Sequence, residues 1–285
     1  MYPEREIVIA LGNTCIGIRC EDREFMEKLT ADYEPFLVSV RPDLSIHFNL
    51  RNKLSVSDIR HIIEHSKVHS EGDRFYTEME MIDCRMKWSE ATLEVETEKN
   101  IFNAEVNYRF MNLMLRGLYS GIFRKMRKTK FDDYLVHGCG VANGERCYLF
   151  TGPSGSGKTT VASLAGGREI LNDETVLIGR NDHGFRLSGT PFDGGLHERN
   201  NSKYHLSAIF FLKHDRQVTI RKLNEVDTYK RLLTQVFDTS PLFESPDNDS
   251  FSEQAELCSR VASGVPAYEL GFLPDSSFWP YIESI

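Results

Sequence analysis

The sequence predicts an α/β fold, preceded by a smaller α+β unit that covers residues 1–103. Two observations in residues 104–285 predict this class. A strand-favouring run at 148–150 leads into a glycine-rich loop and then into 160–164, which favour a helix. An antiparallel hairpin is also expected directly after an acidic strand, unlike the strict strand–helix alternation of a doubly wound sheet.

The first unit is expected to alternate short strands with two helices. Strands at 7–11 and 15–18 are joined by a turn at Gly12-Asn13. A helix runs from Arg23 to about Glu34, because Asp22 is a good N-cap and Pro35 cannot continue a helix. The remaining expected elements are a strand at 44–48, a helix at 55–65 and a strand meander at 74–99 with a turn at Ser89-Glu90.

One motif in this unit, His61 to His65, has the spacing H-x-x-E-H. On a helix it places two imidazoles on one face with a carboxylate beside them, as in some zinc proteases. No third ligand and no cleft are evident in so short a unit. We therefore favour solvent-facing helix histidines over a metal site.

The second unit is expected to begin with a long amphipathic helix at 104–127. Its apolar stripe recurs at helical spacing and consists of Val106, Phe110, Leu113, Met114, Leu118 and Ile122. A basic run, Arg124 to Lys130, falls where this helix should end, and positive charge is favourable there. Two strands within 134–151 are expected around a turn at Asn143-Gly144.

The loop that follows matches the phosphate-binding (P-loop, Walker A) pattern G-x-x-x-x-G-K-[ST] in full. Its glycines let backbone N–H groups turn inward and cradle phosphate oxygens. Lys158 supplies a positive charge for the β- and γ-phosphates, and the Thr159 hydroxyl is suited to bind Mg²⁺. The residues expected to contact the nucleotide are Gly152, Pro153, Ser154, Gly155, Ser156, Gly157, Lys158, Thr159 and Thr160.

A partly apolar strand, Glu169 to Glu174, ends in two acids fifteen residues after the loop lysine. This spacing leaves room for one short helix, which Gly166-Gly167 should end. A carboxylate at Asp173 or Glu174 is suited to hold Mg²⁺, and the other to accept a proton from an attacking hydroxyl. A polar turn is the alternative interpretation of the two acids.

The rest of the chain is expected to complete the domain. The acidic strand leads into the hairpin, with strands at 175–179 and 185–187, and a turn-rich loop at 189–195 could line a pocket. Arg199 and Lys203 are either phosphate contacts or exposed surface charge. The other expected elements are a buried strand at 208–212, a helix at 226–237, a mobile acidic connection at 238–256, a helix near 255–262, a strand at 267–270 and an aromatic tail.

The composition is that of a globular chain of 285 residues, and the net charge of −8 argues against nucleic acid as the main partner. The six cysteines form no C-x-x-C pair, so we expect reduced thiols. No apolar signal core and no membrane-spanning run are present. We therefore expect a cytoplasmic protein with no membrane partner, and the sequence leaves open whether it forms a homo-oligomer.

The motifs together resemble HPr kinase/phosphorylase and its smaller relatives, and more distantly nucleotide-dependent phosphoenolpyruvate carboxykinase. The resemblance covers roughly residues 105–285 and rests on His137-Gly138, the glycine-rich loop fifteen residues later and the acidic pair. The Gly189–Phe192 segment, the strand at 208–212 and the C-terminal segment are also similar to this group. The resemblance implies a P-loop kinase core with a mixed sheet of the HPr-kinase/carboxykinase type.

By position, the resemblance also implies roles for single residues. Lys158 and the loop backbone would bind the phosphates of ATP, while Thr159 and Glu174 would serve Mg²⁺. Asp173 would be the general base that deprotonates a serine-type hydroxyl, with His137 near the transferred phosphoryl group. The second acid is glutamate here where HPr kinase has aspartate, so relatives that phosphorylate peptides or small hydroxyl compounds are as good a model.

The expected activity is therefore that of an ATP- and Mg²⁺-dependent kinase. Its acceptor would be a serine-type hydroxyl of a protein, a peptide or a small molecule. Two other classes remain open: a nucleotide-binding regulatory module without turnover, and a carboxykinase-type lyase. The lyase is disfavoured because no oxaloacetate-binding arginine cluster is evident.

Overall fold

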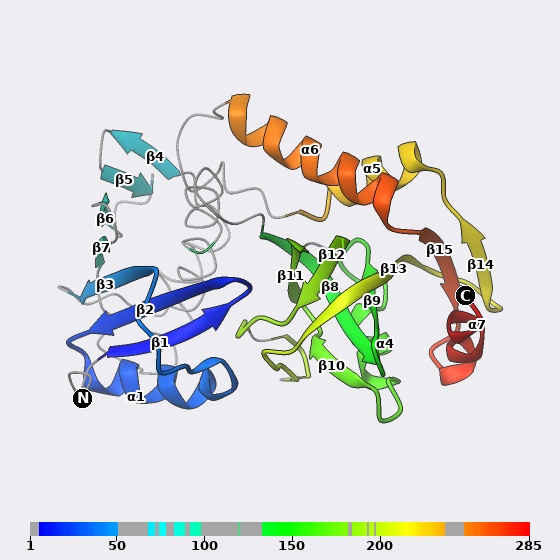
Figure 1. The fold of residues 1–285 in the computed structure, drawn as a ribbon, viewed down its shortest axis with the longest axis horizontal. Coiled ribbons are helices and arrows are strands. Elements are labelled where there is room, and N and C mark those ends of the chain that lie inside the picture. Colours follow the sequence, from blue (N-terminus) through cyan, green and yellow to red (C-terminus); the bar gives the residue numbers. More distant parts are fainter. Residues whose placement is uncertain are drawn as a thin grey trace. The chain divides into compact units, whose positions relative to one another are not determined.

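The fold is seen in a computed structural model of the 285-residue chain (Figure 1). The structure describes residues 6–50, 68–71, 74–77, 83–88, 92–97, 119, 133–181, 184–192, 194–196, 198–236 and 248–285. Internal contacts divide the chain into one unit of Met1–Lys125 with Asp238–Asp247, and another of Met126–Phe237 with Asn248–Ile285. The predicted boundary between residues 103 and 104 lies outside the described residues.

In the described part of the first unit, seven strands form one sheet in the order β1-β2-β3-β7-β6-β5-β4. The strands β2 and β3, and likewise β3 and β7, are parallel, and the other neighbouring pairs are antiparallel. Their bounds are β1 (Glu6–Leu11), β2 (Thr14–Cys20), β3 (Leu44–Leu50), β4 (Val68–Glu71), β5 (Arg74–Thr77), β6 (Asp83–Trp88) and β7 (Thr92–Thr97).

The predicted start of the first helix is confirmed. Helix α1 (Arg23–Asp32) begins after Asp22, whose side chain accepts a hydrogen bond of 2.8 Å from the Phe25 N–H. It ends before the short 3₁₀ helix η1 (Glu34–Phe36), as the proline at position 35 requires. The hairpin β1–β2 and the strand β3 also lie where the sequence predicts them. The helix at 55–65, with its two histidines, and the Ser89-Glu90 turn lie outside the described residues.

The second unit is built on a larger mixed sheet. Its order is β10-β8-β11-β12-β13-β15-β14, and β9 pairs with both β8 and β13. Strand β13 runs parallel to β9 and β15, whereas its pairing with β12 is antiparallel. The strands are β8 (Tyr134–Asn143), β9 (Arg146–Thr151), β10 (Glu169–Asn172), β11 (Thr175–Asn181), β12 (Gly184–Ser188), β13 (Lys203–His214), β14 (Thr219–Lys222) and β15 (Ala267–Phe272).

Few helices accompany this sheet in the part of the chain that the structure describes. They are α4 (Lys158–Ser163), α5 (Glu225–Leu233), α6 (Asn248–Gly264), the 3₁₀ helix η3 (Ser276–Phe278) and α7 (Trp279–Glu283). The unit is thus mixed α/β, as predicted, and the antiparallel hairpin β11–β12 directly follows the acidic strand β10. No helix among the described residues has the length and apolar character that crossing a bilayer requires.

Alternation along the central strands sends side chains into two cores. Leu149 of β9 belongs to the cluster that includes Leu257 and Val261 of α6. Its neighbour Phe150 belongs to the other cluster, with Val161 of α4 and Trp279 of α7. Phe150 meets Trp279 edge-on at a centroid distance of 5.6 Å. The C-terminal aromatic segment therefore packs on the same side of the sheet as α4.

Two helix boundaries and one strand differ from the prediction. Helix α5 ends at Leu233 rather than at 237, and β14 was not expected. Helix α6 begins at Asn248, so the expectation of a mobile connection is wrong from that residue on. Gln254, Leu257 and Val261 are buried along α6, which shows that packing overrides an acidic, serine-rich composition. Apart from Tyr119, which is helical and buried, the helix predicted at 104–127 lies outside the described residues. The basic run at 124–130 and residues 238–247 also lie outside them.

Candidate functional site

The glycine-rich loop spans Gly152–Gly157 and joins the end of β9 to the start of α4. Gly157 has a left-handed φ of 105° and lies directly before the helix. A Cβ at this position would lie 2.7 Å from the Cζ atom of Phe272 on β15, so no larger residue fits without rearrangement. The tip residues Pro153, Ser154 and Gly155 are exposed. The order strand, loop and helix is therefore the one that the sequence predicts.

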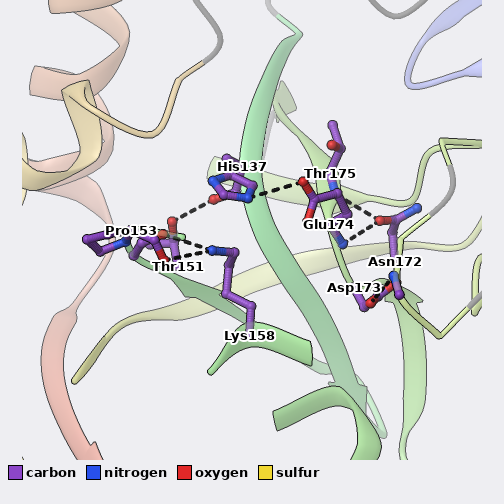
Figure 2. Close-up of polar contacts among 10 residues, drawn as sticks. His137, Thr151, Pro153, Lys158, Asn172, Asp173, Glu174 and Thr175 are labelled. Carbon is purple, nitrogen blue, oxygen red and sulfur yellow. Dashed lines mark hydrogen bonds and ion pairs between the residues drawn. The ribbon is translucent and has the colours of Figure 1, made fainter. Parts of the chain in front are cut away.

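Lys158 folds back over this loop. Its ammonium group donates to the carbonyl oxygens of Gly152, at 2.9 Å, and Pro153, at 3.1 Å (Figure 2). The residue is only 6 % exposed, and burial lowers the pKa of its amine, against the opposing effect of Glu174. An ammonium carries three N–H donors. Two of them are satisfied by the loop, so the arrangement is ready to exchange a carbonyl for an anionic oxygen.

Asp173 lies in the tight turn between β10 and β11 and is fully buried. Its Oδ2 atom accepts hydrogen bonds from the backbone N–H groups of Gly195, at 2.9 Å, and Leu196, at 3.3 Å. Its Oδ1 atom is buried and has no hydrogen-bond partner. Burial raises the pKa of this carboxyl, although the two N–H groups oppose the shift. A buried carboxylate oxygen without a partner is costly in a folded protein and calls for a ligand or a proton.

Thr159 lies close to Asp173, although the two residues come from different elements. A Cβ built on Gly195 would lie 3.2 Å from Cγ2 of Thr159 and 3.6 Å from Oδ2 of Asp173. The Thr159 side chain, at the exposed start of α4, and the buried carboxylate therefore border the same short segment, residues 194–196. The fold thus places Thr159, whose hydroxyl the motif predicts to bind Mg²⁺, near Asp173, one of the two predicted acids.

Glu174 contacts a different predicted residue. Its Oε1 atom lies 3.3 Å from Nε2 of His137 on β8, and Figure 2 shows the two side chains pointing toward one another. The pairing of β8 with β11, in which His137 is opposite Thr175, places them side by side. Both side chains are partly exposed, at 25 % and 34 %. Burial lowers the pKa of Lys158 and the negative charge of Glu174 opposes that shift, so the loop cation lies within the electrostatic reach of Glu174.

A buried asparagine fixes the backbone around the two acids. The Oδ1 atom of Asn172 accepts from the N–H groups of Glu174 and Thr175, at 2.7 and 2.8 Å. Its Nδ2 atom donates to the carbonyls of Thr190 and Phe192. The turn that carries the acids is thereby tied to the loop that begins at Gly189, and residues 194–196 of that loop cover Asp173.

The remaining predicted residues lie around the loop and the acidic turn or on the surface. Ser156 is buried, and its hydroxyl oxygen has no hydrogen-bond partner. Thr160 is half-buried, and its carbonyl accepts from the Ser163 hydroxyl. Arg199 forms an isolated backbone bridge with Asn172, next to the acids, whereas Lys203 is an exposed residue at the start of β13.

The sequence interpretation missed two contributors to this site. The N–H groups of Gly195 and Leu196 hold Asp173, and Nε2 of His214 lies 2.8 Å from the Gly155 carbonyl oxygen. The glycine-rich stretch at 189–195 was a signal for the first, because glycines permit close backbone approach. A histidine at the end of a strand, 59 residues beyond the glycine it contacts, gave no signal.

The loop and the acids form no closed metal cage. Within the described part of the chain, no three His, Cys, Asp or Glu side chains are grouped to hold a metal ion. Mg²⁺ is usually held by one or two carboxylates together with phosphate and water. Asp173, Glu174 and Thr159 offer the hard oxygen ligands that such a shared site needs. Neither a scan of protein-family models nor a search of curated proteins finds a match to this chain.

Proposed function

We propose that this chain is an ATP- and Mg²⁺-dependent kinase that phosphorylates a serine-type hydroxyl. One observation carries the proposal. The buried carboxylate of Asp173, with its unpartnered Oδ1 atom, borders the same segment as Thr159, which directly follows the loop lysine. An anion-binding loop and an acid with an unsatisfied oxygen are the two parts that phosphoryl transfer requires.

The loop supports the binding of a nucleoside triphosphate. The Lys158 amine already contacts two loop carbonyls, and a phosphate oxygen is a stronger acceptor for a charged donor than a carbonyl oxygen. The buried hydroxyl of Ser156 adds a donor that lacks a partner in the same loop. These groups suit the β- and γ-phosphates of ATP.

The oxygen ligands around the loop suit Mg²⁺. Thr159 and Glu174 are the residues that would hold it, which leaves Asp173 free to act as the base. When bound, the ion neutralises negative charge on the phosphate oxygens. The contact between Glu174 and His137 supports this role, because a ligand carboxylate that is oriented by a second side chain binds metal more tightly.

Asp173 is suited to accept the proton of the acceptor hydroxyl. Its raised pKa makes it a stronger base than an exposed aspartate. As the hydroxyl oxygen forms its bond to the γ-phosphorus, the bond from that phosphorus to the β–γ bridging oxygen breaks. ADP leaves with that electron pair, the hydroxyl proton goes to Asp173, and the product is a phosphate monoester. Positioning and charge neutralisation supply most of the rate.

The test uses γ-labelled ATP, Mg²⁺ and a panel of acceptors: serine-containing proteins, peptides and small alcohols. We expect label on an acceptor with the wild type and its loss with Asp173→Asn, while binding of ADP is retained. The matched control is Asp215→Asn. This carboxylate also lies in the second unit, but it contacts Thr219 and Lys213 and not Asp173 or the glycine-rich loop.

The same assay separates the other two classes. Nucleotide binding with neither transfer nor hydrolysis would replace the kinase by a regulatory module. Nucleotide-dependent decarboxylation of oxaloacetate would replace it by a lyase. If the wild type binds neither ATP nor ADP, the proposal of a nucleotide-dependent kinase is wrong.

A further inference from the structure

The carbonyl oxygens of the glycine-rich loop are held by side-chain donors at three positions. Lys158 binds the oxygens of Gly152 and Pro153. The oxygen of Gly155 lies 2.8 Å from Nε2 of His214. Because a carbonyl oxygen only accepts, this nitrogen carries the hydrogen. The third bond differs from the others in that its donor lies outside the loop motif.

The strand ends beneath the loop support it at two points. His214 is the last residue of β13 and is paired with Phe272 of β15. The Phe272 ring lies against Gly157, where a Cβ would come within 2.7 Å of it. Thus the cross-strand pair contacts the loop at Gly155 through the imidazole and at Gly157 through the ring.

The contact from His214 matters at Gly155 because the backbone there can change conformation. It has a left-handed φ of 77° and is exposed at the tip of the loop, and glycine tolerates either sign of φ. If the peptide bond after Gly155 rotated, the Gly155 carbonyl oxygen would turn toward the side of the loop where phosphate is proposed to bind. That oxygen would repel phosphate, whereas a backbone N–H attracts it.

The bond from His214 also does not depend on Lys158. When the lysine turns to a phosphate oxygen, the carbonyls of Gly152 and Pro153 lose its donors, but the Gly155 oxygen keeps its partner. We infer that His214 is a positioning residue for nucleotide binding, because it holds the Gly155 carbonyl against β13 and leaves the N–H groups of the loop for phosphate. This inference rests on the proposed function.

The experiment measures the Kd for MgADP together with kcat and KM for ATP. His214→Ala should raise Kd and KM by about 3- to 10-fold, the range of one net hydrogen bond. The value of kcat should stay within about twofold, because a positioning group for binding acts equally on ground and transition states. His214→Gln should restore most of the affinity, because its amide N–H also donates. The control is His205→Ala, at an exposed histidine on the same strand.

A second measurement separates the inference from the proposed function. Amide hydrogen exchange of the loop without nucleotide should be faster in His214→Ala than in the wild type and in His205→Ala. If the wild type binds no nucleotide, the proposed function is wrong, but hydrogen exchange still measures whether His214 stabilises the loop. Unchanged affinity in His214→Ala, or a loss that His214→Gln does not restore, would overturn the inference.

Discussion

His137 and Glu174 meet across two neighbouring strands, with Nε2 of the imidazole 3.3 Å from Oε1 of the carboxylate. One residue lies in β8, and the other directly precedes β11. Neither is fully buried, so the pair is reachable from solvent. Burial lowers the pKa of Lys158, and the charge of Glu174 opposes that shift, so the pair lies within electrostatic range of the glycine-rich loop.

We predict that His137→Ala raises the Mg²⁺ concentration needed for half-maximal phosphoryl transfer. Removing a partner that orients a metal-binding carboxylate typically costs about 10- to 100-fold in metal affinity or activity. Transfer rates measured over a Mg²⁺ titration check this, with His205→Ala as the control. A lower rate with the same Mg²⁺ dependence would show that His137 acts on something other than Glu174.

We predict that the transfer rate of the wild type falls as pH is lowered, with a midpoint at a higher pH than an ordinary aspartate would give. Asp173 must be ionised to accept a proton, and its pKa is raised above the usual 3.8 by burial. Asp173→Asn should lower kcat by about 10²- to 10⁴-fold. The pH profile of kcat/KM measures the first effect. An acid limb at or below 3.8 would contradict the assignment of Asp173 as the base.

Asp173→Asn should also stabilise the fold at neutral pH. Because the folded-state pKa is raised, the native protein holds this proton more tightly than the unfolded chain. Its contribution to stability is thus full below the ordinary aspartate pKa and is lost as pH rises through the folded-state pKa. Urea unfolding of the wild type and the variant at several pH values checks the sign. The gain should vanish toward low pH; a loss of stability at pH 7 would contradict it.

Gly194→Ala should reduce transfer without reducing nucleotide affinity. A Cβ at this position would lie 2.0 Å from Oδ1 of Asp173, so the carboxylate must move. Displacement of a reacting group by about 1 Å costs about 10²-fold in rate. Transfer kinetics and the Kd for MgADP are compared with Gly144→Ala, which lies in the β8–β9 turn with no atom within 4 Å of the added Cβ. Equal kinetics in the two variants would show that the position of the carboxylate does not limit transfer.

Gly179→Ala should destabilise the second unit far more than Gly144→Ala does. A Cβ at Gly179 would lie 1.9 Å from Oδ1 of Asp133 and 2.5 Å from Nη2 of Arg186. These two groups form a buried ion pair, 1 % and 6 % exposed. Breaking a buried pair costs about 3–5 kcal/mol, whereas a left-handed alanine costs about 1–2 kcal/mol. Free energies of unfolding from urea titrations test the difference, and equal losses would contradict it.

The sequence by itself determined the local elements of the site. The glycine spacing, the lysine and the short helix after them predicted the turn between β9 and α4. The strand that leads to the acidic pair was also predicted, but it ends at Asn172, and the two acids lie in the turn before β11 rather than in the strand. The Asp22 cap and the hairpin β11–β12 were also predicted. Such features depend on neighbours within a few residues, whose backbone preferences can be read directly from residue type.

Only the tertiary structure decided which distant groups meet. Parallel pairing puts β13 between β9 and β15, and this order brings His214 to Gly155. The buried amide of Asn172 ties the acidic turn to the loop that begins at Gly189. Asp173 is buried, and Gly195 and Leu196 of the same loop contact its carboxylate. This burial raises its pKa, and desolvation depends on everything packed around a group and not on its neighbours in sequence.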